Sequence, residues 1–164
     1  MARPLSPFVL SVFAAAVTVH SAVALAQAPK ANTAVDRGRY LVRIGGCNDC
    51  HTTGYTQAGG KVPETRWLTG DQLGWRGPWG TTYPSNLRSY FATISEDKWV
   101  EVARTVEFRP PMPWFTLRDM TAQDLRAIYR FIRSLGAGGA PAPAFVPPGQ
   151  EPKGPVVLFP APPG

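Results

Sequence analysis

The chain of 164 residues contains only two cysteines, and both lie in one short motif, Cys47-Asn48-Asp49-Cys50-His51. This C-x-x-C-H spacing presents two thiols and an imidazole on one short turn of chain. Two thiols can form thioethers with the two vinyl groups of a haem, while the adjacent imidazole ligates the haem iron. The motif therefore predicts one covalently attached haem c, with Cys47 and Cys50 as anchors and His51 as the proximal iron ligand.

The N-terminal segment has the features of a secretory signal peptide. A positively charged start precedes an apolar run over residues 8–19, and an A-x-A cleavage pattern ends at Ala26. We therefore predict that residues 1–26 are a signal peptide and that the protein is exported to the periplasm. An uncleaved membrane anchor facing the periplasm is the alternative, because about 18 mostly apolar residues approach the minimum for a span. Cleavage would remove His20 and leave His51 as the single histidine.

Three other interpretations of the cysteine motif remain open. A thioredoxin-like dithiol also uses C-x-x-C, but that motif begins a helix after a strand, whereas here it follows a predicted helix. A structural zinc site usually takes four ligands, and the mature chain has no further Cys or His to complete one. A disulfide across two residues is strained. The sequence favours haem over all three.

The net charge argues against some classes of partner. The formal charge is +6, and cleavage would lower it to +5 because the signal segment holds one arginine and no acid. The basic residues are scattered rather than clustered, so nucleic-acid binding is not predicted. Membrane association is predicted only if the signal segment is retained, or through a partner complex.

Helical periodicity and capping residues predict three main helices. The caps and the helices that follow them are Thr33 with a helix ending at Gly45, Ser95 with residues 96–107, and Thr121 with a helix ending at Gly136. No segment shows sustained alternation of period two. The predicted fold class is all-α, with about three main helices and long irregular loops.

Two segments lack clear periodicity. Residues 52–93 are rich in Gly, Pro, Thr and Trp, and a compact domain seldom contains so long an irregular stretch unless a large cofactor organises it. The segment after Gly136 is dominated by Pro and Gly, so we expect it to be extended or disordered rather than core. The predicted organisation is a haem domain over residues 27–136 and a C-terminal tail over residues 137–164.

The sixth iron position has two candidate methionines. With one histidine in the mature chain, the distal ligand is Met, a weaker substitute or nothing. Met112 lies between prolines in Arg-Pro-Pro-Met-Pro-Trp, where fixed φ angles can hold a thioether toward a metal. Met120 directly precedes the third helix, where a methionine commonly fills the core. We predict Met112 as the distal ligand, and a haem enzyme or gas sensor with an open sixth position is the less favoured alternative.

Three further residues are candidates for cofactor binding. Tryptophans in the irregular regions can wall a haem, and Trp Nε1 and Arg groups can hold its propionates. Trp79 and Arg76 are the candidates for this role, and Asn86 is a candidate hydrogen-bonding residue near the distal ligand. The competing interpretation is that these tryptophans fold over the core of the protein.

The order of these features resembles class I c-type cytochromes. The stretches GRYLVRIGGCNDCHT, GTTYPSNL, RPPMPW and DLRAIYRFIRSL are similar to haem domains in cytochrome c subunits of bacterial membrane-bound alcohol and sugar dehydrogenases, over about residues 33–136. The resemblance implies the same four haem residues, Cys47, Cys50, His51 and Met112. It also implies that the helices form a cytochrome c-like bundle around one covalently bound haem. In that bundle the N- and C-terminal helices cross, bringing Tyr40 toward Tyr129 and Leu125. Those subunits typically carry several C-x-x-C-H motifs, whereas this chain has one.

The predicted function is one-electron transfer between redox partner proteins, such as a dehydrogenase or a terminal oxidase. No nucleophile with a base, carboxylate pair or phosphate-binding loop stands out, so no enzyme activity is predicted. The alternative is an electron-transfer subunit bound permanently to a dehydrogenase or oxidase complex. In that case the apolar stretch Pro155–Pro160 of the tail would be an interface segment.

Overall fold

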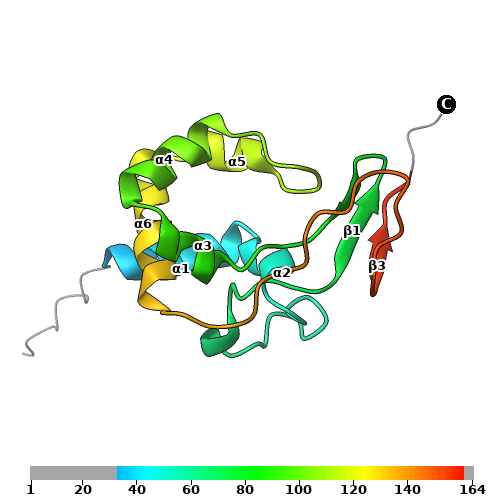
Figure 1. Cartoon of the computed structure of the whole chain (residues 1–164). Helices are drawn as coiled ribbons and strands as arrows, with labels where there is room; N and C mark the ends of the chain where they lie inside the picture. Colours follow the sequence, from blue (N-terminus) through cyan, green and yellow to red (C-terminus); the bar gives the residue numbers. More distant parts are fainter. Residues whose placement is uncertain (1–32, 161–164) are drawn as a thin grey trace, which may run out of the picture. The chain divides into compact units, whose positions relative to one another are not determined.

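The computed structural model describes residues 33–160, which all belong to one compact unit. The fold is mainly helical, as predicted, with a small three-stranded sheet at one end (Figure 1). Among the described residues, no helix has the length and apolar character that crossing a membrane requires. The predicted signal peptide, residues 1–26, lies outside the described residues.

The three predicted helices are present and begin at the predicted caps. They are α1 (Ala34–Ile44), α4 (Glu96–Thr105) and α6 (Ala122–Ser134). The Thr33 side chain accepts a hydrogen bond from the Asp36 N–H, and the Asp36 carboxylate accepts one from the Thr33 N–H, which completes a capping box. Helix α4 ends two residues earlier than predicted, because Val106 is extended. A carboxylate at Glu107 would also oppose the negative end of the helix dipole.

Three short helices and one 3₁₀ turn were not predicted. They are α2 (Cys47–His51), α3 (Leu87–Thr93), α5 (Trp114–Asp119) and η1 (Glu64–Arg66). The longest of them has seven residues, which is too short for a helical period to be recognised in a sequence window. Much of the expected irregular segment 52–93 is therefore ordered by the protein's own backbone.

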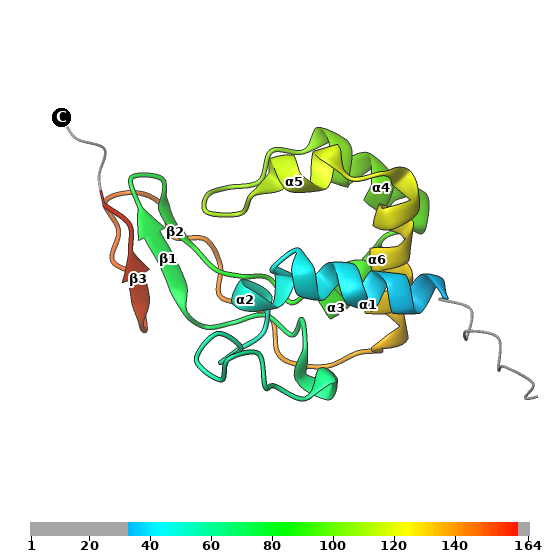
Figure 2. The ribbon, with the colours of Figure 1, turned by 180° about the vertical axis from the view of Figure 1, so that it is seen from behind.

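Helices α1 and α6 cross at Gly38, as the two views in Figure 1 and Figure 2 show. A Cβ atom at Gly38 would lie 2.0 Å from the Ala127 carbonyl oxygen, so only glycine permits this approach. The predicted crossing is confirmed, but the predicted approach of Tyr40 to Tyr129 is wrong. Tyr40 is 52% exposed, and the Tyr129 hydroxyl donates to the Ile94 carbonyl. Residues 38 and 40 lie on nearly opposite faces of a helix, so Tyr40 points away once Gly38 faces α6.

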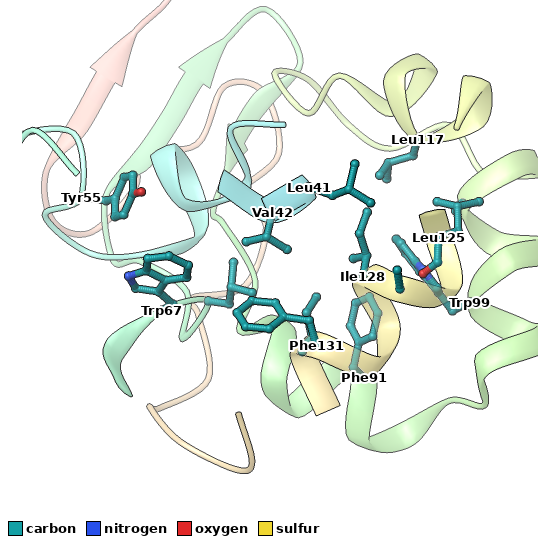
Figure 3. Close-up of a cluster of buried hydrophobic side chains, with 14 residues drawn as sticks. Leu41, Val42, Tyr55, Trp67, Phe91, Trp99, Leu117, Leu125, Ile128 and Phe131 are labelled. Carbon is teal, nitrogen blue, oxygen red and sulfur yellow. The ribbon is translucent and has the colours of Figure 1, made fainter. Parts of the chain in front are cut away.

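The hydrophobic core lies where α1, α3, α4 and α6 meet (Figure 3). Phe91 and Trp99 are in ring contact, with centroids 4.6 Å apart, and the Trp99 Nε1–H donates to the Leu125 carbonyl. Trp67 extends the core toward the irregular segment, with its ring edge-on to Tyr55 and Phe131. Trp67 is therefore a core residue of the protein.

The sheet has the order β2-β1-β3. Strands β1 (Gly74–Gly77) and β2 (Gly80–Thr82) form an antiparallel hairpin, and β3 (Val156–Leu158) from the tail lies parallel to β1. The tail thus pairs with the hairpin in the same compact unit and adds a small sheet to the mainly helical fold. Strands of three or four residues carry too little alternation to be recognised in a sequence.

A surface ion-pair group joins α4 to α6, and it should make stability depend on pH. The Glu96 carboxylate accepts hydrogen bonds from Arg130 and Arg126, which lower the pKa of Glu96 below its ordinary value. The stabilisation is therefore present above the pKa of the unfolded chain and is lost as the pH falls through the lower folded pKa. We expect Glu96→Gln to cost about 0.5–1 kcal/mol of unfolding free energy at pH 7, since solvent screens the half-exposed arginines.

Urea unfolding of both proteins at pH 7 and at pH 3 checks this prediction. The difference should shrink at pH 3, whereas an equal difference at both pH values would contradict it. Glu101→Gln is the matched control, because Glu101 makes only an exposed ion pair with Lys98 within the same helix.

Candidate functional site

The cysteine motif forms its own short helix, α2, directly after α1. Helix α1 ends at Ile44 with Gly45 as its C-cap, and Gly46 adopts the left-handed conformation with φ of 69°, which turns the chain into α2. The turn places Cys47, Cys50 and His51 within one five-residue helix. The local sequence Gly-Gly-Cys therefore determines how the three chemical groups are presented together.

The His51 imidazole is buried and its tautomer is determined by one hydrogen bond. Its Nδ1–H donates to the Ser85 carbonyl at 2.8 Å, immediately before α3. Burial lowers the pKa of His51, and the bond to Ser85 partly opposes this effect. Among the described residues, Nε2 takes part in no hydrogen bond, so its lone pair can bind a metal.

The two cysteines do not fit the three alternative interpretations of the motif. Cys47 and Cys50 are free thiols, so no disulfide joins them. Burial raises the pKa of Cys47 to about 11 and also raises that of Cys50, which disfavours the thiolate that disulfide exchange requires. Within residues 33–160, no cluster of three or more His, Cys, Asp or Glu side chains could hold a metal ion. Two thiols beside a neutral imidazole instead match the donor set of haem c.

A buried polar network anchors α2 to the chain beneath it. The Thr52 hydroxyl donates to Asn48 Oδ1 and accepts from the Leu68 N–H, each at 2.7 Å. Leu68 has a positive φ of 61°, which is uncommon for a residue other than glycine. The Asn48 Nδ2 group is buried and has no partner among the described residues. Because Thr52 ties the C-terminal end of α2 to Leu68 and the Ser85 carbonyl holds His51 Nδ1, the orientation of His51 is set by the folded protein before any ligand binds.

Met112 lies in the loop between α4 and α5. Its side chain is half-buried and packs against the hydrophobic core, and its N–H donates to the Arg109 carbonyl at 3.2 Å. In Figure 1 and Figure 2 this loop extends from α5 toward the end of the protein that carries α2 and the sheet. Met120 is also half-buried, and its Cε lies 3.9 Å from the position a Cβ on Gly45 would take.

Arg76 and Trp79 both lie in the β1–β2 hairpin. The Arg76 guanidinium pairs with both carboxylate oxygens of Glu151 in the tail, which raises the pKa of Arg76. The Trp79 Nε1–H donates to the Thr82 hydroxyl, and its ring packs against Phe159. A haem propionate would therefore have to compete with partners from the chain for both groups, and their role in haem binding stays a prediction.

Asn86 is buried and uses both ends of its amide within the chain. Its Oδ1 caps α3 by accepting the Ser89 N–H, and its Nδ2 donates to the carbonyls of Gly138 and Ala140. Among the described hydrogen bonds, none joins Asn86 to Met112. The amide therefore ties the start of the tail to α3, and a role near the distal ligand stays a prediction.

Sequence reasoning missed two residues that position His51. Ser85 acts through its backbone carbonyl, which has no signature in a sequence. Thr52 directly follows the motif. Its hydroxyl, adjacent in sequence to His51, is the signal by which this residue could have been identified.

Comparisons with known proteins agree with this site. The family model described as cytochrome c matches residues 35–136. The cytochrome c subunits of alcohol dehydrogenase (quinone) from Gluconacetobacter polyoxogenes and Komagataeibacter europaeus are each 31% identical to this chain over 131 residues. Each match covers 72% of this chain but only 25% of the relative, so the chain spans about a quarter of the relatives' length. No solved structure matches the chain significantly.

Proposed function

Because this chain belongs to the cytochrome c family, we propose that it carries single electrons between redox partners through one haem c with His51 and Met112 as axial ligands. The observation that carries the proposal is the His51 ring, which donates from Nδ1 to Ser85 and leaves Nε2 available beside two free thiols. When bound, the haem supplies an iron that alternates between the ferrous and ferric states. The chain is accordingly an electron carrier rather than an enzyme.

The chain's own residues perform three tasks in this function. Cys47 and Cys50 would hold the haem by two thioether links to its vinyl groups. The Ser85 carbonyl holds the His51 proton on Nδ1, which orients the ring with Nε2 available for iron, while burial lowers the pKa of the ring. The Met112 thioether is a soft, weakly basic ligand that raises the iron potential relative to a second imidazole.

Export to the periplasm and the identity of the partner are parts of the same proposal. Export is supported by the signal-like sequence of residues 1–26, although these residues lie outside the described part of the chain. The similarity to cytochrome c subunits of quinone alcohol dehydrogenases favours a dehydrogenase as electron donor. The same similarity favours a second candidate, a permanently bound subunit of such a complex.

Co-purification of a quinone-dependent dehydrogenase with the tagged holoprotein in mild detergent would favour the bound subunit, and isolation of the monomeric holoprotein would favour the free carrier.

The ligation is tested by absorption spectroscopy of the oxidised holoprotein. We expect Met112→Ala to abolish the weak iron–sulfur charge-transfer band and to lower the reduction potential, since the thioether is lost. Met112→His should keep a low-spin iron without the sulfur band. Met120→Ala is the matched control, because Met120 also packs half-buried against the core, and it should leave the band unchanged.

Two outcomes would contradict the proposed ligation. Loss of the band in Met120→Ala with its retention in Met112→Ala would assign the sulfur to Met120. High-spin iron in the unmodified protein would show an open sixth position and would favour ligand binding or catalysis over electron transfer.

A further inference from the structure

The loop that carries Met112 is held only weakly by its own backbone. Among the described residues, backbone hydrogen bonds of residues 107–113 join the loop to itself or to the start of α5, but not to another part of the fold. Phe108 packs against the core, whereas Arg109 and Pro110 are exposed. Apart from the packing of Phe108 and Met112 against the core, the position of the loop therefore depends on contacts that reach it from other elements.

Strand β2 supplies the first of these contacts. The Thr82 hydroxyl donates a hydrogen bond to the Pro110 carbonyl, two residues before Met112. The same hydroxyl accepts the Trp79 Nε1–H at 3.0 Å, which leaves its own proton directed to Pro110. Because proline fixes φ on both sides of Met112, holding the Pro110 carbonyl restricts the path of the whole loop.

The C-terminal tail supplies the second contact. The Arg109 guanidinium lies 4.1 Å from the centroid of the Phe145 ring, within the range of a cation–π interaction. Behind it, the Phe145 ring lies 3.1 Å from the position a Cβ on Gly80 would take, so the ring packs directly on the hairpin backbone. Phe145 is therefore located between the hairpin and the Met112 loop.

The tail is itself hydrogen-bonded to the hairpin at more than one point along its length. Val146 exchanges two backbone hydrogen bonds with Thr81, at 2.8 and 3.0 Å, next to Phe145. The pairing of β3 with β1 and the Asn86 bonds to Gly138 and Ala140 hold the tail on either side of this point. The tail and the hairpin thus form one unit. This unit contacts the Met112 loop through Thr82 and Phe145.

We propose that the hairpin and the C-terminal tail position the Met112 thioether for iron, with Thr82 and Phe145 acting as positioning residues through Pro110 and Arg109. The proposal rests on the proposed ligation by Met112. It assigns residues 137–160 a specific role at the distal side, where they limit how often the loop moves away and exposes the sixth iron position. Weakening either contact increases the population of the open loop, which a competing ligand can then capture.

The test is a titration of the oxidised, full-length holoprotein with imidazole, followed by loss of the iron–sulfur band. Thr82→Val removes the hydroxyl at nearly constant volume, and we expect it to tighten apparent imidazole binding about fivefold, the effect of one hydrogen bond. Phe145→Ala should tighten imidazole binding about threefold through loss of the cation–π contact. Both variants should also have a lower reduction potential. Thr82→Ser should restore the original affinity, because it keeps the hydroxyl.

Two matched controls separate positioning from general destabilisation. Thr93→Val removes a hydroxyl that donates to the Tyr90 carbonyl in α3, and Leu158→Ala truncates an exposed side chain in the same tail. Neither should change imidazole affinity. In a double-mutant cycle, Arg109→Gln combined with Phe145→Ala should tighten binding no more than either change alone, because both remove the same contact.

Unchanged imidazole affinity in both Thr82→Val and Phe145→Ala would overturn the positioning role, provided that Met112→Ala abolishes the band. Retention of the band in Met112→Ala would instead refute the ligation itself, so the two failures are distinguishable. Equal effects from the controls and the test variants would also overturn the role, because the change would then be non-specific.

Discussion

Replacing Gly38 with alanine is expected to lower the free energy of unfolding by about 3 kcal/mol, near the upper end of the usual cost of overpacking. The added Cβ would lie 2.0 Å from the Ala127 carbonyl oxygen and 2.7 Å from the Phe131 Cβ. Neither neighbour can yield easily, since the first is helix backbone and Phe131 is fully buried. Helices α1 and α6 would have to separate, and this would loosen the core behind α2.

The sign of the change in unfolding free energy distinguishes overpacking from free space at the helix crossing. Alanine is a better helix former than glycine by about 1 kcal/mol, so a Gly38→Ala protein that was more stable would show that space exists at the crossing. Thermal unfolding of the holoprotein, followed by circular dichroism, measures the change. Arg37→Ala is the control, because this neighbouring side chain makes an exposed ion pair with Asp124 and a contact with the exposed Tyr40 ring, and the loss of such surface contacts should have little effect.

Replacing Arg88 with methionine is expected to cost about 3 kcal/mol of unfolding free energy, because buried backbone carbonyls lose hydrogen bonds to a charged donor. Its side chain is 6% exposed, and its guanidinium donates to the backbone carbonyls of Trp67, Glu64, Thr65 and Leu135. Burial lowers the pKa of Arg88 from its ordinary value, but the group remains charged at neutral pH. Methionine fills the volume while leaving four carbonyls without this donor.

Arg88 joins the irregular segment to the end of α6, so its loss should also affect the site. Its backbone and that of Leu87 bond to Leu68, which in turn bonds to Thr52 below α2. Arg88→Lys should be intermediate in stability, because an ammonium group lacks the planar fork of five donors. Arg66→Met is the matched control, since Arg66 is exposed, and urea unfolding compares the three variants. A loss in Arg88→Met no larger than in Arg66→Met would contradict the prediction.

The tail illustrates how a local prediction can miss the larger role of a segment. Proline and glycine in residues 137–164 predict extended or disordered chain, and in the described part of this tail the structure places strand β3. Nothing in that composition indicates that Val156 pairs with Gly74 or that Phe145 contacts Arg109. These partners lie far apart in the chain, and the pairing depends on where α6 ends relative to the hairpin.

Local signals were sufficient for the features that depend on neighbouring residues. Thr33, Ser95 and Thr121 each cap a backbone N–H three residues ahead, so the starts of the main helices follow from short-range chemistry. The spacing of Cys47, Cys50 and His51 likewise contains the haem-attachment chemistry within a single turn of helix.

The long-range features were decided by the tertiary structure. The Ser85 carbonyl that orients His51 lies 34 residues away, and a backbone oxygen is identical in every residue type, so no pattern could have indicated it. The sequence contains sixteen glycines and does not distinguish Gly38 from the others. Its role follows only from its close contact with α6. The haem-attachment chemistry is therefore encoded locally, whereas its orientation and support arise from backbone groups and close packing that exist only once the chain has folded.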